Sequence, residues 1–148
     1  MKTAYRVLAY AIAALVAVQS AAICYGVFAQ MNWIENGGTI DAGVFESNAP
    51  GTGAFIFHAL DGGVILLASL ALLIVSFFAK IPQGVRWAVI VLVCTIVQIA
   101  LGPLSHFLAA IGAVHGAVAL VLFGVAVMAA MRARKPAVVE ETVPANVA

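Results

Sequence analysis

Three histidines are the residues of this sequence best suited to chemistry: His58, His106 and His115. Each lies in or beside a long apolar stretch, and ionisable or metal-binding side chains are costly inside a membrane span, so they are candidates for a functional site. His58 and His115 each follow the start of an expected helix, at Ala54 and Ile111, by four residues. That spacing puts both imidazoles roughly 6 Å below the helix start. Two imidazoles at matched depth on parallel helices can hold one flat cofactor from opposite sides, so we predict that His58 and His115 ligate the iron of one b-type haem.

The neighbours of these histidines fit a large flat ligand. Glycines at Gly62–Gly63, Gly112 and Gly116 let the backbone come close where a macrocycle needs space. Asp61 follows His58 by three residues on a similar helix face. Two interpretations of Asp61 stay open: it accepts a proton from a ligating imidazole or contacts a propionate-bound water, or it faces the outer head groups.

His106 differs from the other two histidines because it follows Pro103 in a short turn. It lies at helical spacing from Gln98 and Gly102, so Gln98 and His106 are further candidates for a cofactor site, where His106 would serve a haem propionate, a zinc ion or nothing. A zinc or copper site formed by all three histidines is an alternative, since imidazole suits either metal. Another alternative is a membrane accessory protein without a cofactor, in which the histidines only cap helix entrances.

The composition indicates that membrane-spanning helices position these residues. The chain has 148 residues, of which 65% are hydrophobic and 9% charged, and its mean hydropathy is +1.15, which excludes an ordinary soluble domain. A net charge of +1 without a long basic tract gives no reason to expect a nucleic-acid partner. Apolar runs near the 20 or so residues needed to cross a bilayer predict an all-α bundle of four transmembrane helices, at about 7–28, 54–78, 87–104 and 111–131. We expect one transmembrane domain over 1–135 and a disordered tail over 136–148.

The basic residues predict the orientation of the four spans. All seven Lys and Arg fall before the first span, between the second and third, or after the fourth: Lys2, Arg6, Lys80, Arg86, Arg132, Arg134 and Lys135. The positive-inside rule makes that side cytoplasmic, with both termini, and puts Gln30–Gly53 and Pro103–Ala110 outside. We expect a multi-pass plasma membrane protein, and the high Ala and Val content favours a bacterial source. Cleavage of the first span after Val27–Ala29 stays an alternative, although the run is long for a signal peptide.

Two cysteines and a set of small residues complete the expectations. Cys24 and Cys94 lie within apolar runs and are interpreted as small buried hydrophobic residues. Small residues on the first span allow close packing within the bundle or in a homo-oligomer, and both possibilities stay open. These residues are Ala9, Ala13, Ala14, Ala17 and Ala21.

Three short stretches carry a resemblance to a known family. Val97–Gly102 and Val114–Leu120 resemble the third and fourth helices of one four-helix repeat in the haem A synthase family, and Phe57–Leu60 is similar to its second helix. In that family each half binds a haem between histidines of its second and fourth helices, near the outer face. The resemblance covers about half of the chain and implies the same ligands, His58 and His115.

The departures from that family bear on activity. Family chains contain two repeats, and this chain has length for one. The family's acidic residue before the second-helix histidine is Phe55 here, the arginine after it is Ala59, and the first outer loop lacks the cysteine pair of many bacterial members. We therefore expect haem binding without haem A synthesis, in electron transfer or haem handling, with a membrane quinone or an outer redox partner.

Overall fold

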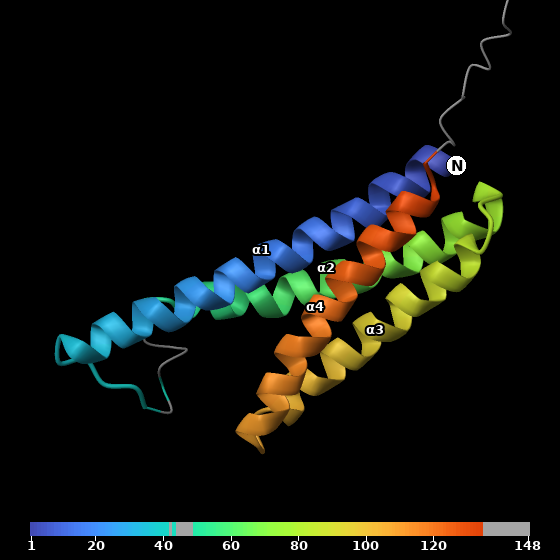
Figure 1. The fold of residues 1–148 in the computed structure, drawn as a ribbon. Coiled ribbons are helices and arrows are strands. Elements are labelled where there is room, and N and C mark those ends of the chain that lie inside the picture. The colour runs from blue at the N-terminus through green and yellow to red at the C-terminus, as the bar shows by residue number, and fades with distance from the viewer. Residues whose placement is uncertain (42, 44–48, 135–148) are drawn as a thin grey trace, which may run out of the picture.

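Four long helices make up the fold. The computed structural model describes residues 1–41, 43 and 49–134. It contains α1 (Lys2–Glu35), α2 (Thr52–Ala79), α3 (Gly84–Leu104) and α4 (Ala109–Arg132), and the described residues contain no strand (Figure 1). Each helix is long and apolar enough to cross a membrane. The prediction of an all-α fold with four such helices is confirmed.

The helices form an antiparallel bundle in which each one packs against two neighbours. Contacts join α1 with α2, α2 with α3, α3 with α4 and α4 with α1, so α2 and α4 face each other diagonally. One end of the bundle holds the start of α1, the turn between α2 and α3 and the end of α4 (Figure 1). We call it the basic end, because every Lys and Arg that the structure describes lies there. We call the opposite end, where α2 and α4 begin, the histidine end.

The tightly packed core lies in the half of the bundle near the basic end. Tyr5 is fully buried, and its hydroxyl donates a hydrogen bond to the carbonyl oxygen of Gly84 at 2.9 Å, which ties the start of α1 to the start of α3. The Arg132 guanidinium stacks over the Trp87 ring, 5.4 Å from its centroid, and ties the end of α4 to α3. The buried residues of α4 all lie in its second half: Leu122, Ala126, Ala129 and Ala130. The basic end therefore fixes the bundle, and the histidine end is less densely packed.

One glycine holds α1 and α2 close together near the histidine end. Gly51 precedes α2 with a φ of +86°, a conformation that a side chain rarely adopts. A Cβ at this position would also lie 2.5 Å from the carbonyl oxygen of Gly26 on α1. Only glycine therefore permits the chain to enter α2 at this distance from α1.

The observed helices extend beyond the apolar runs of the sequence. Gln30–Glu35, expected as loop, continues α1, because backbone hydrogen bonds propagate past the point where side chains become polar. α3 continues through Pro103 to Leu104. The expected tail over 136–148 lies outside the described residues.

The expectation that both cysteines are buried is wrong for Cys24. Cys94 is half-buried, whereas Cys24 is exposed on the surface of α1. An apolar run alone does not tell a lipid-facing position from a position inside the bundle. The same holds for the alanines of α1, since Ala9 and Ala13 are buried and Ala17 is exposed.

Candidate functional site

His58 and His115 meet across the centre of the bundle. His58 is the seventh residue of α2, which begins at Thr52, and His115 is the seventh residue of α4, which begins at Ala109. α2 and α4 are diagonal partners, so side chains from the two helices reach each other only through the bundle axis. The ring centroids are 6.0 Å apart, with 64° between the ring planes. The two histidines that the sequence pairs by depth are therefore neighbours in space.

A hydrogen bond to the backbone fixes the ring of His115. Its Nδ1 lies 3.1 Å from the carbonyl oxygen of Gln98 on α3. With a proton on Nδ1, His115 donates to that carbonyl, and its Nε2 carries a free lone pair. Metal-ligating histidines commonly use their second nitrogen in this way, because the bond fixes both tautomer and ring orientation.

The segment around His58 is bound to α1 by a glutamine. Gln19 Nε2 donates to the backbone carbonyl of His58 at 3.3 Å. The Asp61 carboxyl interacts with the side chain of Gln19 and with His58. A Cβ on Gly62 would lie 3.6 Å from Gln19 Nε2, so the small residue lets the two helices approach around this contact. Polar groups from all four helices thus lie together in the bundle: the side chains of Gln19, His58, Asp61 and His115 and the backbone carbonyl of Gln98.

Several polar atoms of this cluster are buried without a hydrogen bond. Asp61 is 6% exposed and Gln98 is 9% exposed. Among the residues that the structure describes, no partner is found for Nδ1 of His58, Oδ2 of Asp61 or Oε1 of Gln98. Burying a polar group without a partner costs about 1–3 kcal/mol, so three such atoms at one level favour a site that holds a polar or metal-bearing ligand. Asp61 faces the bundle interior, which argues against the head-group interpretation.

Glycines lie near both imidazoles. The nearest atom to a Cβ built on Gly102 of α3 is Cε1 of His115, at 3.8 Å, so His115 lies directly against a position without a side chain. Gly63 and Gly116 are exposed, and a Cβ on either would meet nothing within 4 Å in the described structure. Gly102 is therefore the glycine that lets the backbone of α3 lie close to the His115 ring.

His106 does not join the pair. It is exposed in the turn after α3, where its backbone N–H donates to the carbonyl of Pro103 at 3.2 Å. Over residues 1–41, 43 and 49–134, no three His, Cys, Asp or Glu side chains form a group that could hold a metal ion. The geometry therefore brings two imidazoles together, and over the described residues it does not assemble the three-histidine zinc or copper site.

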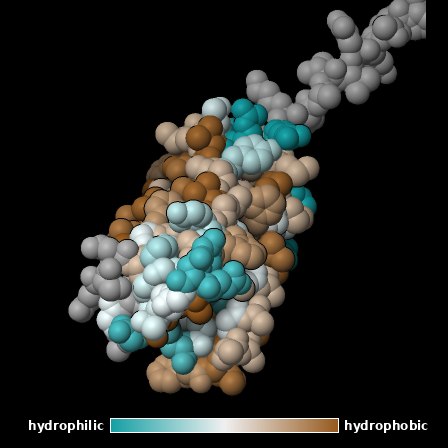
Figure 2. All heavy atoms as spheres, turned by 90° about the vertical axis from the view of Figure 1, so that its left-hand side faces the viewer, coloured by the Kyte–Doolittle hydropathy of each residue, from teal (hydrophilic) through white to brown (hydrophobic). Residues whose placement is uncertain are grey.

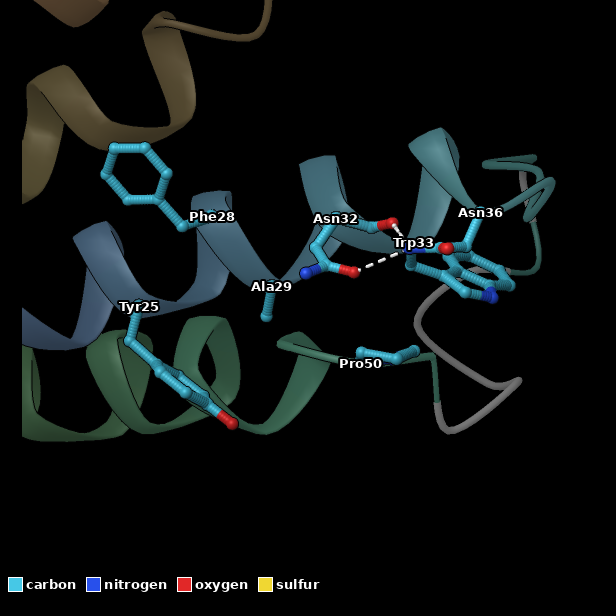
Figure 3. Close-up of a pocket in the computed structure, with 7 residues that line it drawn as sticks. All are labelled: Tyr25, Phe28, Ala29, Asn32, Trp33, Asn36 and Pro50. Atoms are coloured by element: carbon cyan, nitrogen blue, oxygen red, sulfur yellow. Dashed lines mark hydrogen bonds between the residues drawn. The ribbon is translucent and has the colours of Figure 1, made fainter.

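A separate cavity of about 470 Å³ lies further out along α1. Tyr25, Phe28, Ala29, Asn32, Trp33 and Asn36 of α1 line it together with Pro50 (Figure 3). The Asn36 side chain donates to Oδ1 of Asn32 at 2.8 Å, so these two amides bind each other. Viewed from this end, hydrophilic surface gathers near the end of α1, where Asn32, Glu35 and Asn36 are exposed (Figure 2). None of the cluster around the histidines lines this cavity, and its aromatic rings are typical of a membrane interface.

Two contributions to the cluster were missing from the sequence prediction. Gln19 lies on α1, where no histidine or acidic residue drew attention to it, although an amide in an apolar helix is itself a signal. Gln98 was selected, but the group that contacts His115 is its backbone carbonyl, which side-chain identity does not reveal. No family model matches this chain, and no curated protein and no solved structure matches it.

Proposed function

We propose that this chain is a multi-pass membrane protein that binds one b-type haem between His58 and His115. The observation that carries the proposal is the 6.0 Å separation of the two imidazole centroids across the bundle. A metal ion about 2 Å from one nitrogen of each ring would hold the centroids at roughly this distance. The resemblance of Val97–Gly102 and Val114–Leu120 to a haem A synthase repeat supports the same ligand pair.

The surrounding residues suit a resident cofactor. The Gln98 carbonyl orients His115, and Gln19 holds the backbone of His58. Gly102 lets the His115 ring lie close to α3, since a Cβ there would be 3.8 Å from its Cε1. The unpaired polar atoms of Asp61 and Gln98 would gain partners from a bound ligand or its waters.

When bound, haem would supply a one-electron redox centre. Each histidine is the seventh residue of its helix and therefore lies roughly 9 Å from the helix start. The hydrocarbon core of a bilayer is about 30 Å thick. Held by these two histidines, a haem would be at a depth from which a membrane quinone or a partner at the histidine end could be reached. The proposed role is therefore electron transfer at that face or the handling of haem itself, in a bacterial plasma membrane.

The proposed orientation places the basic end and both termini in the cytoplasm. The described Lys and Arg residues all lie at this end, and the positive-inside rule assigns such an end to the cytoplasmic side. The haem would then lie near the outer face. This orientation makes an outer redox partner the expected one.

The visible absorption spectrum of the purified protein tests the proposal. Wild-type protein from haem-replete cells should show an intense Soret band, and His58→Ala or His115→Ala should remove most of it. His106→Ala is the matched control, because it deletes an exposed imidazole outside the pair. Wild-type protein without a Soret band, and without haem uptake on titration, would overturn the proposal in favour of a cofactor-free accessory protein or another metal.

A further inference from the structure

A second cavity, of about 420 Å³, lies at the basic end of the bundle. The start of α1 and the residues that follow α4 form it, and these segments lie beside each other in Figure 1. Its lining consists of Lys2, Thr3, Arg6, Ala133 and Arg134. Three of these five side chains are cationic, and Thr3 adds a hydroxyl group.

The positive charge of this cavity is not balanced by the described carboxylates. Glu35, Asp41 and Asp61 are at the end of α1, in the loop after it and within α2 toward the histidine end. Arg134 is held in place by a hydrogen bond from its Nη2 to the hydroxyl oxygen of Tyr10, at 3.0 Å. That bond uses one of the five N–H donors of the guanidinium, so the others stay available to a ligand.

The backbone at the start of α1 adds to the attraction for an anion. Among the residues that the structure describes, no side chain caps this helix, so its first backbone N–H groups have no side-chain acceptor there. The helix dipole also places partial positive charge at this end. A cavity that combines two arginines, a lysine and a helix start matches the charge and the hydrogen-bonding capacity of a phosphate group.

The position of the cavity favours a lipid head group as the source of a bound phosphate. The apolar surface of α1 and α4 ends at Arg6 and Arg132, which is where a membrane leaflet changes from hydrocarbon to head groups. Basic pockets between transmembrane helices at this level bind phosphate-bearing lipid head groups. We propose that the cavity lined by Lys2, Arg6 and Arg134 binds the head group of an anionic phospholipid. This proposal rests on membrane insertion and is independent of haem binding.

The chain contains its own control for diffuse charge effects. Lys80 and Arg86 flank the turn between α2 and α3 at the same end of the bundle, and neither lines the cavity. A pair of substitutions there removes the same charge as a pair in the cavity. Both pairs of basic residues contribute to membrane orientation under the positive-inside rule. Only the pair that lines the cavity should contribute to lipid binding.

Native mass spectrometry of the full chain tests the proposal. Wild-type protein, Arg6→Gln/Arg134→Gln and Lys80→Gln/Arg86→Gln are released from micelles that contain equal amounts of phosphatidylglycerol and phosphatidylcholine with the same acyl chains. Wild type and the Lys80/Arg86 variant should retain phosphatidylglycerol preferentially. Loss of two cationic contacts should weaken that retention roughly 30-fold in the cavity variant. Equal loss in both variants, or no preference in wild type, would overturn the proposal.

Two further arms cover the source of the phosphate and the folding of the variant. Inorganic phosphate should neither raise the melting temperature of wild type nor displace the lipid, and equal stabilisation by inorganic phosphate would replace the lipid with a soluble anion. Should the double variant lose its helical circular dichroism, Lys2→Gln and Arg6→Gln are measured singly. Each should lower phosphatidylglycerol retention, and unchanged retention in both folded variants would refute the site. The haem spectrum of every folded variant should stay that of wild type.

Discussion

A buried hydrogen bond between Ser69 and Thr95 should stabilise the bundle on the side of the histidine pair that faces the basic end. Their hydroxyl oxygens lie 3.0 Å apart, at 0% and 1% exposure, and join α2 to α3. Thr95 Oγ1 also donates to the carbonyl of Val91 at 2.9 Å. Because a hydroxyl has one proton, Ser69 is the donor of the bond between the helices.

The size of the effect follows from this geometry. Hydrogen bonds between transmembrane helices contribute about 0.6 kcal/mol on average, and at most about 1.7 kcal/mol. The 3.0 Å separation is at the long end for a bond between hydroxyl groups, so the average value is the better expectation. A double-mutant cycle with Ser69→Ala and Thr95→Val should therefore give a coupling energy of about 0.6 kcal/mol.

Reversible unfolding in mixed micelles, followed by circular dichroism, measures this coupling. Ser76→Ala with Thr95→Val is the matched control cycle, because the Ser76 hydroxyl donates only to the Leu73 carbonyl of its own helix, at 2.6 Å. The control coupling should be zero within error. A zero coupling for Ser69 and Thr95 as well would refute the claim that this pair joins α2 to α3. The haem spectrum should be unchanged, because neither hydroxyl touches the proposed ligands.

Three other predictions concern topology and the site. A reporter that is active only outside the cytoplasm should work when it is inserted in Gln30–Gly53 and fail after Lys135, and the reverse pattern would invert the orientation. His106→Ala should leave the haem spectrum intact, whereas a loss as large as in His115→Ala would put a ligand on the turn. Gly102→Ala should bind haem, because its Cβ would be in ordinary contact with His115 Cε1 at 3.8 Å. Gly102→Leu should displace that ring and weaken haem binding while helicity is retained, and equal binding by both variants would show that the ring is not confined there.

The architecture could be predicted from the sequence because bilayer thickness dictates apolar runs of fixed length. Four such runs leave little choice of fold class, and the helices are where the runs are. The ends of α1 could not be predicted in this way, since Gln30–Glu35 stays helical through backbone bonds that do not depend on side-chain polarity. The exposure of Cys24 could not be predicted either, because lipid and the bundle interior are equally apolar.

The candidate site could be predicted in part for similar reasons. Equal distance from the helix starts was enough to pair His58 with His115, because α2 and α4 run parallel and depth is proportional to residue count. Which helices are diagonal depends on packing around the bundle, so the meeting of the two rings at its centre needed the structure. The contact between the Gln98 carbonyl and His115 also could not be predicted from the sequence, since every residue carries a backbone carbonyl.

The most direct test of haem binding between His58 and His115 is electron paramagnetic resonance of the purified ferric protein, with iron quantified per chain. The proposed ligand pair, whose ring centroids are 6.0 Å apart, predicts one low-spin haem per chain with two imidazole ligands. His58→Ala and His115→Ala should each abolish the low-spin signal, and His106→Ala should preserve it. A full low-spin signal in either of the first two variants, or two haems per wild-type chain, would contradict the proposed ligand pair.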